Sequence, residues 1–209
     1  MAWSIVWQWF SGQKDLTIGI TMSGRNLDIP GIMEIVGLLI NTVPFRIKDM
    51  PGASVSERLK QLSIDLITIE EVIDTPLDVI RKSGNIDYFS PLFESVIVIQ
   101  NYPMDVVTPY FGGGHPLSID LESSFYMTDL NLVLSVTLHK GIKLSYSYHP
   151  KQLTKQLIVQ LNKQLINVLQ EIANSSINEP WFPQLESATS EDLTQDITNL
   201  VLQMEADFD

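Results

Sequence analysis

Hydrophobic residues recur along this chain with two spacings, one typical of helices and one typical of strands. Residues 2–10 are apolar on nearly every side and predict a short helix that ends at Ser11-Gly12. Apolar residues spaced three or four apart predict long helices over 54–73 and 151–173. Short apolar or alternating runs predict strands over 16–22, 42–47, 95–100, 117–121, 130–138 and 142–148. This mixed order predicts an α/β sandwich with a mixed sheet rather than a doubly wound parallel sheet.

The helix over 54–73 carries clear signals at both ends. Ser54 is suited to cap its first turn, and Glu57 stands at the capping-box position three residues later. Thr75-Pro76 ends the helical pattern, because proline lacks the amide hydrogen that a continuing helix needs. The apolar stripe of this helix consists of Val55, Leu59, Leu62, Leu66 and Ile69.

Proline and glycine also mark the strands. Pro30-Gly31 opens a predicted short helical piece over 32–39. Pro44 predicts that the next strand begins near it or lies at an edge of the sheet. The apolar run over 95–100 predicts a strand that is buried on both faces. The last two predicted strands are joined by a tight turn and form a hairpin.

The apolar helix over 2–10 predicts burial on several sides. No earlier residues are available to cover it. This is a first hint of a truncated or split domain.

Composition narrows the class of protein. The 209 residues, 44% of them hydrophobic and 18% charged, are typical of one packed globular domain. Cysteine is absent and the three histidines are scattered, so no disulfide and no metal site are expected. The net charge of −12 makes nucleic acid a poor candidate partner. Residues 1–10 have no basic flank and are too short to cross a bilayer, so we predict a cytoplasmic protein with no membrane partner.

Four blocks of sequence, in order, resemble the second lobe of the condensation domains of nonribosomal peptide synthetases. The first covers residues 3–25 and includes Ser23-Gly24-Arg25. The second, residues 30–46, is similar to the family's Gly-x-Phe-x-Asn-Thr-x-x-x-Arg block, with Leu39 where the family commonly has Phe. Residues 74–80 and 90–103 resemble the two blocks that follow, although the former lacks the usual His or Asn before its Pro. The resemblance extends over roughly residues 2–185, and we treat residues 1–185 as one domain.

The resemblance implies a chloramphenicol-acetyltransferase-like fold, with this chain as one lobe of a two-lobed domain. In the family, carrier proteins deliver phosphopantetheine-tethered substrates into a tunnel between the lobes, where an amine attacks a thioester to form an amide. The catalytic motif His-His-x-x-x-Asp-Gly lies in the other lobe, and this chain does not contain it. We therefore predict no catalytic residue and no bound cofactor here. The implied partners are an N-terminal lobe and carrier proteins.

The resemblance also implies candidate substrate-tunnel residues. Asn41 matches the family's asparagine, which either hydrogen-bonds the substrate or holds nearby main chain in place. Ser23 and Arg25 match a loop that faces the tunnel and the interface between the lobes, although an isolated arginine often simply pairs with an acid. Thr42 follows Asn41 in the same block.

Residues 186–209 form a separate acidic tail with seven acids and no lysine or arginine. An amphipathic helix is predicted over 190–206, and its apolar stripe is Leu193, Ile197, Leu200, Val201 and Met204. Such a tail resembles a docking element that recruits the next synthetase polypeptide. The alternatives are a solubilising tail and a helix that packs on its own domain.

Three interpretations remain at the level of sequence. The chain is a condensation lobe that works with a separate N-terminal lobe, in trans or in a larger assembly. Alternatively, it is a non-catalytic module that docks carrier proteins or other synthetase polypeptides, or it is an excised fragment.

Overall fold

The computed structural model describes residues 1–26, 28–88, 90–93, 95–100, 110–111, 115–116, 130–138 and 141–185. The predicted strand over 117–121 and the docking stripe Leu193, Ile197, Leu200, Val201 and Met204 lie outside these residues. The division into residues 1–185 and a tail over 186–209 therefore stays a prediction.

The core of the fold is a five-stranded sheet in the order β2-β1-β3-β6-β7. Its strands are β1 (Asp15–Ser23), β2 (Ile40–Lys48), β3 (Ser95–Gln100), β6 (Leu132–Leu138) and β7 (Ile142–Tyr148). β1, β3 and β6 are parallel, and β2 and β7 are antiparallel to their neighbours. The two-residue strands β4 (Tyr110–Phe111) and β5 (His115–Pro116) pair separately. The predicted mixed sheet is confirmed, and Pro44 lies in β2 at an edge of the described sheet.

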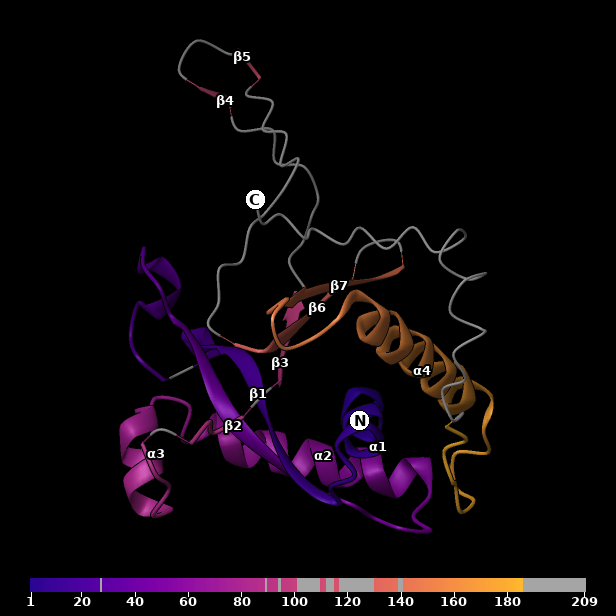
Figure 1. The fold of residues 1–209 in the computed structure, drawn as a ribbon. Helices are drawn as coiled ribbons and strands as arrows, with labels where there is room; N and C mark the ends of the chain where they lie inside the picture. The colour runs from indigo at the N-terminus through magenta and orange to yellow at the C-terminus, as the bar shows by residue number, and fades with distance from the viewer. Residues whose placement is uncertain are drawn as a thin grey trace.

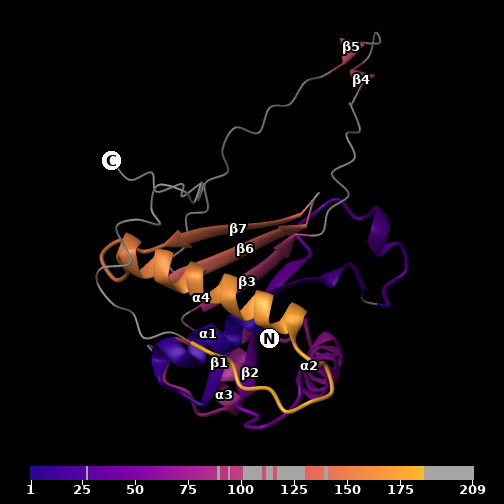
Figure 2. The same ribbon diagram turned by 90° about the vertical axis from the view of Figure 1, so that its right-hand side faces the viewer.

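The long helices lie on one face of this sheet (Figures 1 and 2). The helices are α1 (Ala2–Ser11), α2 (Val55–Glu70), α3 (Leu77–Ser83) and α4 (Lys155–Asn174), with 3₁₀ turns η1 (Gly24–Asn26) and η2 (Ile32–Glu34). α1, α2 and α4 contribute apolar side chains to one core together with all five strands. The fold is a two-layer α/β sandwich, as the sequence predicted.

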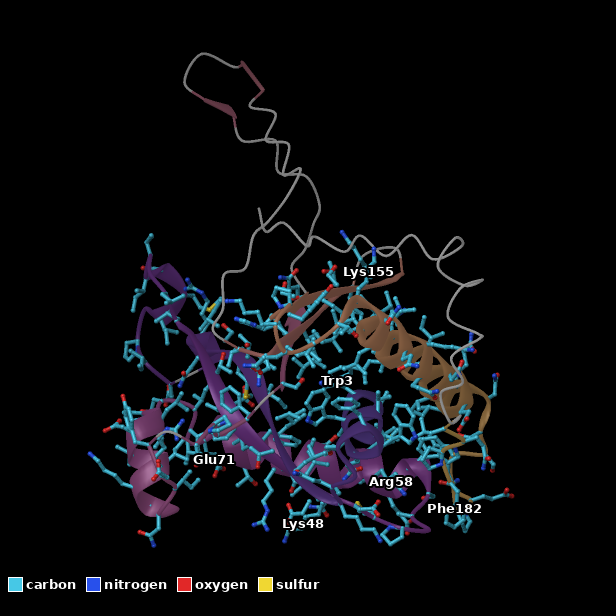
Figure 3. All side chains as sticks on the ribbon, viewed as in Figure 1. Trp3, Lys48, Arg58, Glu71, Lys155 and Phe182 are labelled. Atoms are coloured by element: carbon cyan, nitrogen blue, oxygen red, sulfur yellow. The ribbon has the colours of Figure 1, made fainter. Side chains whose placement is uncertain are left out.

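Helix α1 is buried by later parts of the same chain. Trp3, labelled in Figure 3, is 3% exposed. Its indole Nε1 donates a hydrogen bond of 2.8 Å to Ser95 Oγ on β3. Its ring stacks on Trp7 at 5.7 Å and meets Tyr146 of β7 at 6.2 Å. The predicted burial is confirmed. The sheet and α4 cover this helix, so its burial by itself does not require another polypeptide.

Helix α2 begins where the sequence predicted, but part of its apolar stripe is exposed to solvent. Ser54 Oγ accepts the Glu57 amide, and the Glu57 carboxylate accepts the Ser54 amide, so the capping box is confirmed. These hydrogen bonds hold the pKa of Glu57 below its usual value. Leu59 and Leu66 are 42% and 36% exposed. These two residues of the apolar stripe therefore face solvent, because α2 packs on the core through Val55, Leu62 and Ile69.

The C-terminal hairpin and α4 are joined by a buried polar contact. The hydroxyl of Tyr146 in β7 and Asn162 Oδ1 in α4 lie 3.0 Å apart, and both residues are buried. Burial raises the pKa of Tyr146. Helix α4 starts at Lys155, later than predicted, because Thr154 caps it and the preceding turn bonds back to the carbonyl of His149. His149 thus has a structural place between β7 and α4.

Candidate functional site at the carboxyl end of the sheet

The carboxyl ends of β1, β3 and β6 meet at one end of the sheet, where β2 and β7 begin. The predicted site residues gather there. Ser23 pairs with Ile40, Asn41 pairs with Met22, and Thr42 pairs with Thr21 across the β1–β2 ladder. Long-range strand pairing thus brings two of the resembling sequence blocks together.

The side chain of Asn41 is directed to neighbouring main chain. Its Nδ2 donates a hydrogen bond to the carbonyl of Ile73, which follows helix α2 and is 2% exposed. The contact satisfies a carbonyl beyond the helix end and holds the α2–α3 connection against β2. It agrees with the structural alternative for Asn41. A role in binding substrate stays a prediction.

Thr42 does not share a sheet face with Asn41. Side chains alternate along a strand, so neighbouring residues point to opposite faces. The Thr42 hydroxyl lies 3.0 Å from that of Thr21 in β1, on the face opposite to the core. Asn41 belongs to the face that carries α1 and α4. The two residues cannot line one side of the sheet together.

Arg25 holds the loop that connects β1 to β2. Its Nη1 donates to the carbonyls of Ile32 and Ile35 at 3.0 and 3.2 Å, and the Arg25 amide reaches Ser23 Oγ at 3.4 Å. Among the described residues, the Arg25 guanidinium bonds main-chain carbonyls and forms no ion pair with an acid. The predicted helix over 32–39 is wrong beyond Glu34. The guanidinium takes carbonyls that a continuing helix would bond to its own amides.

The core face of the sheet continues past its helices at this end. Ile99, Leu138 and Ile142 are 56%, 41% and 63% exposed. They stand on the same face as Ile97 and Val136, which pack against the core. The predicted burial of the strand over 95–100 is therefore wrong at Ile99. Among the described residues, nothing covers this last row of apolar side chains.

Sequence reasoning missed a second exposed group in the β1–β2 loop. Six apolar residues here are exposed to solvent: Ile29, Met33, Ile35, Val36 and Leu38 in the loop, and Ile40 at the start of β2. The signal was present in the sequence, because residues 28–40 contain only two charged side chains, Asp28 and Glu34. The expected helix concealed it, since a helix would have turned some of these residues inward.

The groups at this end suit binding and positioning. Ser23, Thr42 and Asn41 offer hydroxyls and an amide, and Arg25 offers a fixed positive charge. The only histidine side chain that the structure describes, His149, follows β7 at the opposite end. Within the described ranges, no three or more His, Asp or Glu side chains lie close enough together to hold a metal ion. The helices found there are also too short or too polar to span a bilayer.

Curated relatives of this chain are large peptide synthetases. One polypeptide of the linear gramicidin synthase of Brevibacillus parabrevis, called the gramicidin synthase relative below, is 31% identical over 175 residues, which cover 84% of this chain and 3% of that protein. Another polypeptide of the same synthase is 38% identical over 104 residues, covering 50% of this chain and 1% of the relative. The chondramide synthase cmdD of Chondromyces crocatus is 28% identical over 193 residues, which cover 92% of this chain and 5% of that protein. The chain thus spans a small part of each relative.

Solved structures show the same fold. The starter condensation domain of the rhizomide synthetase RzmA superposes with a TM-score of 0.64 at 19% identity, covering 89% of this chain and 43% of that one. The structure of holo T3CT superposes with a TM-score of 0.67 at 16% identity, and the match covers 87% of this chain and 42% of that one. The chain therefore spans less than half the length of these structures. The family model that matches residues 1–183 is described as the condensation domain, so this chain belongs to the condensation-domain family of nonribosomal peptide synthetases.

Proposed function

We propose that this chain is the C-terminal lobe of a condensation domain and that it forms one wall of a substrate tunnel and part of a carrier-protein dock. Amide formation would then require an N-terminal lobe that carries the histidine motif. The proposed substrates are aminoacyl or peptidyl groups tethered to carrier proteins through phosphopantetheine. The acidic tail would recruit the next synthetase polypeptide.

One observation carries this proposal. The match to the RzmA condensation domain takes in 89% of this chain but only 43% of that structure, and the sequence contains no His-His-x-x-x-Asp-Gly motif. A single lobe compared with a two-lobed domain is expected to match over nearly its whole length while covering only part of the larger domain.

The division of chemistry follows from the groups that are present. Amide formation needs the attacking amine held close to the thioester carbon, with a polar group that positions it and settles its proton. The carboxyl end of this sheet supplies hydroxyl, amide and guanidinium groups together with an apolar surface. These groups support orientation of a substrate. The partner lobe would supply the histidine.

A second candidate function is a non-catalytic module that docks carrier proteins or other synthetase polypeptides. The contact between Asn41 and the Ile73 carbonyl favours it, because the best tunnel candidate is already engaged with main chain. The two candidates predict different products in the same experiment.

Reconstitution separates these functions. The chain is mixed with two carrier proteins loaded with aminoacyl groups and with the N-terminal lobe of the condensation domain that it matches in the gramicidin synthase relative. Mass spectrometry then follows the carrier-bound dipeptide. We expect dipeptide only when both lobes are present, and an N-terminal lobe with its lead histidine replaced serves as control. Turnover by this chain alone contradicts the proposal, and binding of carrier proteins without turnover favours the docking module.

Replacing Asn41 with alanine tests its role at the site. Loss of its hydrogen bond to the partly buried loop is expected to lower the free energy of unfolding by about 1 kcal/mol. If Asn41 acts only on Ile73, the rate of dipeptide formation by the two mixed lobes should decrease only in proportion to the fraction of the variant that is folded. Urea unfolding and the dipeptide assay measure the two quantities. A loss of turnover in fully folded protein would instead support contact with substrate.

A further inference from the structure

We propose that the cavity between α1, α2 and the end of β2 binds a small zwitterion with an aliphatic body, the chemistry of a free amino acid such as leucine. The cavity lies at the amino end of β1, whereas the candidate tunnel residues lie at its carboxyl end. The inference therefore goes beyond the proposed function and does not depend on it.

The cavity has the size and the lining of a small-molecule site. Its volume is about 460 Å³, within the range of pockets that bind small ligands. Its apolar lining includes Ile5 of α1, Ile47 of β2 and Leu62 of α2. Ile5 is 5% exposed, and the other two pack against the core. These side chains are therefore held in place and offer an aliphatic ligand a preformed surface.

Arg58 supplies a positive charge that is buried without an anion. It is 9% exposed, and its Nε and Nη2 donate to the carbonyls of Ala53 and Met50 at 3.3 and 2.6 Å. One face of the guanidinium lies over the ring of Trp181. Neither ion pair of the described residues includes Arg58. Because buried charges are normally paired and a guanidinium has further N–H donors, Arg58 is suited to bind a carboxylate in the cavity.

Asp49 supplies the opposite charge at the same cavity. Burial lowers the pKa of Arg58, and the nearby Asp49 carboxylate opposes that shift. The two side chains still form no ion pair within the described part of the chain. Opposite charges that line one cavity without touching can be bridged by a ligand that carries both. The ligand carboxylate would bind Arg58, and its ammonium group would bind Asp49.

Other charged groups at the cavity are already engaged. Arg46 is paired with Asp15 at 2.6 Å, and Asp65 accepts a hydrogen bond of 2.9 Å from Gln61. Figure 3 labels Arg58 beside α1 and α2, near the end of the sheet where the exposed Lys48 lies. Arg58 and Asp49 thus remain as the pair that a ligand would complete.

The two charges distinguish this ligand from the proposed tunnel substrates. An aminoacyl group tethered as a thioester has an ammonium group but no free carboxylate, so it would leave Arg58 unpaired. A simple aliphatic acid has the carboxylate but leaves Asp49 unpaired. A free amino acid with an aliphatic side chain satisfies both charged side chains and the apolar lining.

Isothermal titration calorimetry of the whole chain with three related ligands tests the proposal. L-leucine carries both charges, 4-methylpentanoate lacks the ammonium group, and 3-methylbutylamine lacks the carboxylate. We expect leucine to bind, and the other two ligands to bind at least about tenfold more weakly, because each loses one charge-assisted hydrogen bond.

Three variants connect binding to the named side chains. Arg58→Gln and Asp49→Asn are each expected to weaken leucine binding at least about tenfold. Asp49→Asn should leave binding of 4-methylpentanoate within about twofold, since that ligand has no ammonium group for Asp49 to bind. Lys60→Gln removes a charge from α2 outside the cavity and should leave leucine binding within about twofold.

Thermal unfolding separates a binding role from a structural one. Arg58 also holds main-chain carbonyls, so Arg58→Gln is expected to lower the unfolding temperature. If that variant does not fold, Asp49→Asn decides the point, because no described hydrogen bond involves the Asp49 side chain. Absence of leucine binding, equal binding of the three ligands, or undiminished leucine binding by folded Asp49→Asn overturns the site. None of these results affects dipeptide formation by the two mixed lobes, which tests the proposed function separately.

Discussion

Replacing Trp3 with alanine is expected to lower the free energy of unfolding by about 3–5 kcal/mol, the cost of emptying a buried aromatic site. Trp3 lies between the sheet and α4, stacks on Trp7 and contacts Tyr146. The substitution also leaves Ser95 Oγ, which is fully buried, without its donor. Urea unfolding followed by circular dichroism measures the loss.

The neighbouring Trp9 provides the control. It lies on the same helix but is only partly buried. Trp9→Ala is therefore expected to cost clearly less than Trp3→Ala. Trp3→Phe should give an intermediate loss, because it keeps much of the ring volume and removes the indole donor. Equal unfolding midpoints for the two alanine variants would show that α1 does not pack against the sheet as described.

Introducing a side chain at Gly19 is expected to destabilise the sheet by about 1–3 kcal/mol, because it overpacks a filled space. Gly19 lies in β1 between its partners Pro44 and Val96. A Cβ atom there would lie 2.6 Å from Val96 Cγ2 and 2.9 Å from the ring of Phe93. Gly19→Ala must therefore displace both side chains, and denaturant unfolding reports the cost.

Another glycine of the chain serves as a control for this test, and a second substitution next to Gly19 is expected to relieve the steric overlap. A Cβ at Gly37 meets nothing within 4 Å, so Gly37→Ala should leave the free energy of unfolding nearly unchanged. In the Gly19→Ala background, Val96→Ala removes the nearest atom and should cost less than it does alone. Additive losses in the double variant would contradict steric overlap as the cause.

The elements of the fold were largely predictable because their signals are local. The capping box at Ser54 and Glu57 and the glycine after α1 specify helix ends through contacts a few residues apart. Strands over 16–22 and 142–148 were recognised from alternation, and the strands over 42–47 and 130–138 were also predicted. Helix lengths were less accurate, and α4 begins four residues later than predicted because His149 and Thr154 organise the preceding turn.

The surroundings of the candidate site were not predictable from periodicity. An apolar run over 95–100 looks the same whether helices cover its whole length or end before Ile99. The apolar stripe of α2 likewise does not reveal that Leu59 faces solvent. Both depend on where α1, α2 and α4 lie against the sheet.

By itself, the amino-acid sequence determined the kinds of elements, their order and the family to which the chain belongs, because these follow from short-range patterns and from conspicuous blocks of residues. The tertiary structure alone decided that Asn41 holds the Ile73 carbonyl, that Thr42 faces the opposite side of the sheet, and that Arg25 shapes an exposed apolar loop. The physical reason is that these contacts join residues whose spacing in the chain carries no periodic signal. Only the pairing of strands and the seating of helices bring such residues together.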